Sequence, residues 1–89
     1  MNTSEFTAKL KQDGFREVET KMLQPRPGND EHAHDYLVRG LVLEGEFIVT
    51  CAGQPHSYHS GETFEVAAGV AHNEAVGDNG ARILVGRKY

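Results

Sequence analysis

The first fourteen residues carry a helical pattern of apolar positions. Phe6 and Leu10 are four residues apart, so both side chains would lie on one face of a helix. The threonine and serine at positions 3 and 4 are suitable N-caps, and Gly14 is a suitable end. We therefore predict a helix over about 3–13, which needs tertiary support because an isolated helix of this length is marginal.

After Gly14 the period changes from helical to two. Val18, Thr20 and Met22 alternate with charged residues, as in a half-buried strand. Further strand-like segments, separated by Gly, Asn, Asp and Ser, are predicted over 32–36, 37–43, 46–51, 54–58, 63–66, 72–76 and 81–87. The residues between 43 and 46 are expected to turn, and 77–80 to form a hairpin loop. Many short strands at this spacing indicate an antiparallel sandwich or barrel over about 17–87.

Composition narrows the class of protein. The 89 residues correspond to one domain, 1–89, and the net charge of −4 argues against nucleic acid and anionic membranes as partners. No apolar run approaches the length of a membrane span or a signal-peptide core. Cys51 is the one cysteine, which excludes an internal disulfide and favours a reducing, cytoplasmic location.

Histidines supply the candidate chemistry. His32 and His34 are one residue apart, so on a strand both side chains would project from the same face. A third histidine from a distant strand, His72, would complete a three-nitrogen site with open coordination positions. Such a site suits Zn, Fe, Ni, Mn or Cu. The alternative is a solvated polar strand face that binds no metal.

These residues also carry a family resemblance. The stretch from Gly28 to the valine at 76 resembles the cupin superfamily, in particular its small single-domain members. In the first cupin motif, Gly28, His32, His34 and Gly45 match, although only three residues separate the first glycine from the first histidine. In the second motif, Gly61, Gly69 and His72 match at the family spacing. The resemblance implies an all-β fold, a small antiparallel jelly-roll barrel, with the short helix outside it.

The sequence departs from the cupin motifs at three places. The motif glutamate falls on Val38 or Arg39, depending on the end from which it is counted, and neither can bind a metal. The motif proline is Ala67, and the motif asparagine is Val76. The resemblance therefore implies a three-histidine site without its carboxylate.

Three more residues are expected to line the pocket. Tyr36, Val38 and Gly40 share the parity of His32 and His34, so they would face the same interior. Tyr36 could donate a hydrogen bond to a ligand, and the alternative is an ordinary core tyrosine. The valine would make one wall apolar, and the glycine would leave space for a ligand.

Two classes of function fit these observations. The first is a metalloenzyme of the dioxygenase, isomerase or lyase type, acting on a small polar molecule at the three-histidine metal site. The second is a non-catalytic small-molecule binding or sensory module, because one barrel hosts many activities.

The outer face of the barrel leads to a prediction about assembly. Leu41 and Leu43 have the opposite parity to the histidines, so they would face outward or into a second layer. A small barrel also leaves strand edges to cover. We therefore expect a homodimer that buries such positions.

Overall fold

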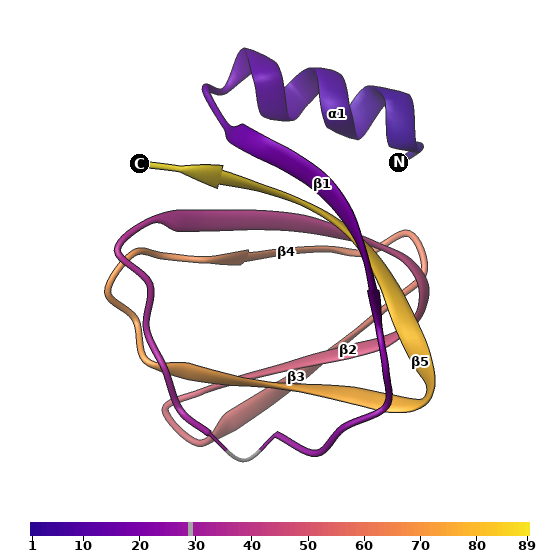
Figure 1. The fold of residues 1–89 in the computed structure, drawn as a ribbon, viewed down its shortest axis with the longest axis vertical. Helices are drawn as coiled ribbons and strands as arrows, with labels where there is room; N and C mark the ends of the chain where they lie inside the picture. The colour runs from indigo at the N-terminus through magenta and orange to yellow at the C-terminus, as the bar shows by residue number, and fades with distance from the viewer. Residues whose placement is uncertain (29) are drawn as a thin grey trace.

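The computed structural model describes residues 1–28 and 30–89 and shows one helix and five strands (Figure 1). All the strand pairs are antiparallel and belong to one sheet, in the order β1-β5-β2-β3, with β4 also paired to β2. The elements are α1 (Thr3–Gln12), β1 (Arg16–Leu23), β2 (Leu37–Cys51), β3 (Gln54–His59), β4 (Thr63–Val66) and β5 (His72–Lys88). The all-β fold with one short helix is confirmed.

Helix α1 forms where its pattern predicts, although its N-cap is one residue earlier than expected. The Asn2 side-chain oxygen accepts a hydrogen bond from the Glu5 backbone N–H at 2.8 Å. Gly14 follows the helix with φ of +87°, a conformation that glycine adopts without steric cost. Phe6 and Leu10 are both buried, as the spacing predicts.

Strands β2 and β5 run through the positions predicted to be turns, so those two turn predictions are wrong. Their pairing shifts register near Gly45, which lies opposite Ala81. Gly45 and Gly80 both have positive φ, so the extra residues form bulges that bend the strands rather than end them. Figure 1 shows β5 turning sharply and passing from one side of the barrel to the other.

The face of strand β1 that points into the barrel is not the face of Val18, Thr20 and Met22 that its apolar pattern suggested. Leu23 packs against the core inside the barrel, and Lys21 is on the same side of the strand. Val18 is on the outer face, where it packs against the apolar cluster under α1. Met22 has the same parity as Val18 but is 74% exposed. The helix thus covers the outer face of β1 at one end only.

Two apolar clusters stabilise the fold. The inner cluster fills much of the barrel, and its buried members are Val42, Phe47, Val49, Phe64, Val66, Val76, Ala81, Ile83 and Val85. The outer cluster lies between α1 and the sheet, and its buried members are Phe6, Leu10, Phe15, Leu41 and Leu84. Leu41, which the sequence assigned to a possible dimer contact, is 1% exposed because α1 covers it. The second layer on this face is the chain's own helix, and the homodimer stays a prediction.

Candidate metal site

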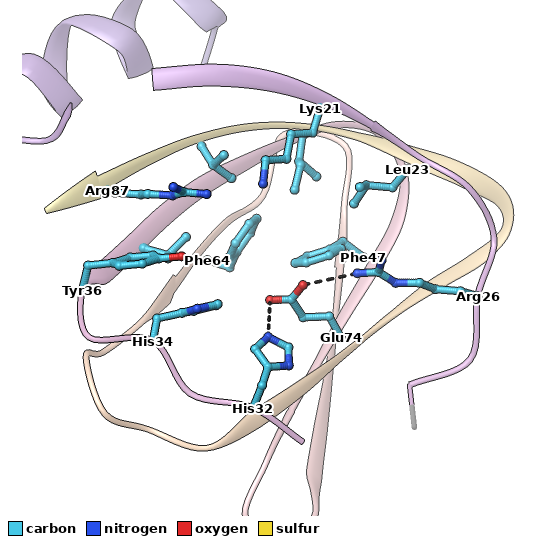
Figure 2. A pocket seen from close by; sticks show the side chains of 13 residues that line it. Lys21, Leu23, Arg26, His32, His34, Tyr36, Phe47, Phe64, Glu74 and Arg87 are labelled. Carbon is cyan, nitrogen blue, oxygen red and sulfur yellow. Dashed lines mark hydrogen bonds and ion pairs between the residues drawn. The ribbon is translucent and has the colours of Figure 1, made fainter. Parts of the chain in front are cut away.

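Four side chains from two distant segments meet at one end of the barrel interior. His32 and His34 come from the segment before β2, whereas His72 and Glu74 come from the start of β5. Each residue offers one ligand atom, and these atoms all lie within 4.8 Å of one another. Figure 2 shows His32 and Glu74 facing each other across the base of a cavity, with His34 beside them.

The His-x-His segment is not the strand predicted over 32–36. His32 pairs with His72 as an isolated bridge, through two backbone hydrogen bonds of 2.8 Å. Strand β5 begins at His72, so the segment meets β5 at its first residue only. This single bridge places the side chains of the two histidines next to each other.

The three imidazole rings are close to one another. Ring centroids are 4.4 Å apart for His32 and His72, 4.9 Å for His32 and His34, and 5.2 Å for His34 and His72. His72 is fully buried, His34 is half-buried, and His32 is exposed. The site therefore opens to solvent on the His32 side.

Backbone carbonyls determine how two of the rings are oriented. His72 Nδ1 lies 3.0 Å from the Val70 carbonyl oxygen, and His32 Nδ1 lies 3.4 Å from that of Asp30. A carbonyl oxygen only accepts hydrogen bonds, so these contacts favour a proton on Nδ1 of each ring. In the neutral ring Nε2 then carries a lone pair, as a metal ligand requires.

Both of these Nε2 atoms face the same carboxylate oxygen. Glu74 Oε2 lies 3.2 Å from His72 Nε2 and 3.8 Å from His32 Nε2. Two lone pairs turned toward an anionic oxygen repel it unless a proton or a metal ion lies between them. The donor set thus fits a cation.

Glu74 is the site residue that the sequence reasoning missed. The three histidines were expected to stand without a carboxylate, but the cluster includes one, which comes from β5 rather than from the position of Val38 or Arg39. Strand alternation carried the signal: Glu74 follows His72 by two residues and so shares its face. The nearby acids Glu31 and Asp35 are exposed.

Charge and burial also act on His34. Burial is the largest cause lowering the pKa of its imidazole, followed by the positive charge that His32 and His72 would carry if protonated. The ring stacks on Tyr36 at a centroid distance of 4.8 Å and an interplanar angle of 13°. The lowered pKa favours the neutral, metal-binding form of the imidazole.

A cavity of about 190 Å³ adjoins the cluster. Tyr36 and Val38 line it, together with apolar side chains that include Phe47 and Phe64. Gly40 does not line it. A Cβ built on this glycine would lie 2.2 Å from Cζ of Phe64, so the space over Gly40 holds the phenyl ring rather than a ligand.

A family model described as a cupin domain matches residues 20–86, which is most of the chain. The chain belongs to the cupin family. The matched segment contains all four residues of the cluster, so the candidate metal site lies within the cupin domain.

Solved structures support the same barrel. A cupin protein from Bacteroides fragilis is 16% identical with a TM-score of 0.64, over 79% of this chain and 62% of that one. The EutQ protein of Clostridium difficile is 20% identical with a TM-score of 0.69, over 86% of this chain and 60% of that one. Oxalate decarboxylase of Bacillus subtilis, a protein with Mn(II) centres, is 20% identical with a TM-score of 0.67, over 80% of this chain and 20% of that one.

At these identities the likeness shows the fold alone. This cupin domain spans 50–62% of the length of the first three solved structures that it matches. The comparison with curated proteins yields no match. Within the described part of the chain, no helix has both the length and the apolar character needed to cross a bilayer.

Proposed function

We propose that this cupin domain is a metalloenzyme that binds a divalent transition metal through His32, His34, His72 and Glu74 and acts on a small polar molecule in the adjacent cavity. The observation that carries the proposal is the convergence of four potential ligand atoms within 4.8 Å of one another. Dioxygenase, isomerase and lyase chemistry all fit a site of this kind.

The donor set suits such a metal. Three imidazoles and one carboxylate favour Zn, Fe, Ni, Mn or Cu over the all-oxygen sites of Mg and Ca. When bound, the metal would supply a Lewis acid or a redox centre beside the cavity. Hydrogen bonds from Nδ1 to backbone carbonyls hold His72 and His32 in the orientation that ligation requires.

Neighbouring side chains would position the ligand and the carboxylate. Arg26 donates a hydrogen bond to Glu74 Oε1 at 3.3 Å, which leaves Oε2 turned toward the histidines. Figure 2 shows the Tyr36 hydroxyl directed into the cavity, where it can donate to or accept from a bound molecule. Phe47 and Phe64 cover the inner wall and exclude water from it.

The test is metal content and metal-induced stabilisation. Wild type, His72→Ala and Glu74→Gln are purified without a histidine tag, and zinc is added after dialysis against a chelator. At a hundredfold excess of zinc over its dissociation constant, the wild type should gain about 2.7 kcal/mol in free energy of unfolding. His72→Ala should lose the bound zinc and this gain, and Glu74→Gln should weaken both.

His56→Ala is the matched control, because His56 is exposed and lies outside the cluster. This variant should bind zinc as the wild type does. Equal zinc content and equal stabilisation in His72→Ala and the wild type would contradict the proposed site.

Cytoplasmic location and a homodimer complete the proposal, and both rest on the sequence. Light scattering at high protein concentration tests the assembly, since a monomer there would contradict it.

A further inference from the structure

The cavity beside the histidines is cationic, although the chain as a whole is acidic. Lys21, Arg26 and Arg87 line it, and Glu74 is the one carboxylate among the lining residues that the structure describes. The net charge of the whole chain is −4. The positive charge of this cavity is therefore opposite in sign to the net charge of the chain, and it indicates an anionic ligand.

The three cations differ in how far the protein already neutralises them. Arg26 is paired with Glu74 at 3.3 Å. Arg87 lies 3.4 Å from Glu17, which is outside the cavity lining. Within residues 1–28 and 30–89, no carboxylate forms an ion pair with Lys21. Lys21 is thus the cation most available to a ligand.

Lys21 and Arg87 come from paired strands and face one space. Figure 2 shows the ammonium of Lys21 and the guanidinium of Arg87 both directed into the cavity. The guanidinium also lies 4.9 Å from the ring centre of Tyr36, which restricts its position. Together these groups form a cationic end of the cavity, separate from the histidine cluster.

The surroundings strengthen an interaction with an anion at this end. Leu23, Val38 and Phe64 are among the apolar side chains that line the same cavity. Charges interact more strongly where apolar groups exclude water, and an unpaired cation there is unfavourable until a counter-charge binds.

The size of the cavity limits the ligand. Its volume of about 190 Å³ corresponds to roughly six water molecules at ~30 Å³ each. We infer that the cavity binds a small carboxylate, whose carboxylate group lies against Lys21 and Arg87 while its other polar end faces the histidine–glutamate cluster. The second half of this inference rests on the proposed metal site, whereas the first half does not.

Malonate is the probe, because it carries a carboxylate at each end and has a neutral counterpart of the same shape, malonamide. Isothermal titration calorimetry measures the binding of each to metal-free and to zinc-loaded protein. Malonate should bind both forms, more tightly when zinc is present, and malonamide should bind neither measurably. Inorganic phosphate is the third probe, and binding of phosphate without binding of malonate would overturn the carboxylate assignment.

Two substitutions test the cationic end. Lys21→Gln removes one charge-assisted hydrogen bond to the ligand, so it should weaken malonate binding about tenfold or more. Arg87→Gln should also weaken malonate binding. Lys21→Arg should restore most of the affinity. Lys11→Gln removes one positive charge from the exposed surface of α1 and should leave affinity unchanged. Circular dichroism checks that each variant is folded.

The result that overturns the inference is unchanged malonate affinity in folded Lys21→Gln and Arg87→Gln, or malonamide binding as tightly as malonate. If the proposed metal site is wrong, the experimental result differs from the one above. In that case zinc content would not depend on His72, but the effect of Lys21→Gln on malonate binding to metal-free protein would persist.

Discussion

The two faces of the central strands β2 and β5 are used in opposite ways. On the outer face, Leu41 and Leu84 are buried under α1 in a cluster whose members are all apolar. On the inner face, the same strands contribute to a core that stops short of filling the barrel. The remaining space is lined by histidines, Glu74 and three cations.

The difference shows how a chain of this length combines stability with a site. A small domain has little interior, and an unfilled cavity removes packing from it. The closed cluster under the helix adds buried apolar surface without touching the cavity. We therefore expect substitutions on the outer face to change stability and leave ligand binding intact, whereas substitutions on the inner face should change ligand binding, with or without a loss of stability.

The largest effect on stability is expected from Leu10→Ala. Leu10 is fully buried in the outer cluster, and truncation of such a residue costs about 2–5 kcal/mol in free energy of unfolding. Urea denaturation measures this loss, and calorimetry of the folded fraction should show unchanged zinc affinity. Met22→Ala is the control, because Met22 is largely exposed. A loss of zinc binding by folded Leu10→Ala would contradict the separation of the two faces.

A smaller but still large effect is expected from Gly40→Ala on the inner face. The new Cβ would lie 2.2 Å from the Phe64 ring, and overpacking of this kind costs about 1–3 kcal/mol. Displacement of the ring toward the cavity should also weaken malonate binding. In the background of Phe64→Leu, Gly40→Ala should lower the free energy of unfolding by less, because the smaller leucine side chain leaves space for the new Cβ. Equal costs in the two backgrounds would show that the phenyl ring is not the obstacle.

A pH-dependent effect is expected from His34. Its pKa is lowered from 6.5 in the folded protein, so just below pH 6.5 the unfolded chain binds more protons than the folded one. The free energy of unfolding of metal-free protein should therefore fall as the pH is lowered from 6.5, and His34→Gln should reduce this fall. His56→Gln serves as the exposed control. Urea denaturation at each pH measures the free energy of unfolding. Identical dependence of this free energy on pH in the wild type and His34→Gln would contradict this cause.

The smallest effect is expected from the surface ion pairs of Arg39. This residue contacts Asp13 at 2.5 Å and Glu65 at 2.7 Å, and its guanidinium lies over the Phe15 ring. The hydrogen bond from Arg39 lowers the pKa of Asp13 and is the largest cause of that shift. Because these side chains are partly exposed to solvent, Arg39→Gln should change the melting temperature only slightly, and less so at high salt. A loss as large as that of Leu10→Ala would place Arg39 among the core residues.

Prediction from the sequence was most successful where the signal was local. The spacing of Phe6 and Leu10 predicted both the helix and its buried face. The cupin motifs pointed to the residues His32, His34 and His72, which the structure brings together. The turns predicted around Gly45 and Gly80 were wrong, because a glycine with positive φ is equally suited to a turn and to a bulge in a continuous strand.

The sequence by itself determined the cupin family, the strand-rich fold and the three histidines, since motif spacing and strand alternation are properties of neighbouring residues. Only the tertiary structure decided that the carboxylate of Glu74 lies beside the three histidines and that Lys21 faces the cavity. Alternation separates the two faces of a strand, but it does not say which face is inside. That choice depends on how β1 and β5 pair and on which outer residues α1 covers, and both are contacts between residues far apart in the chain.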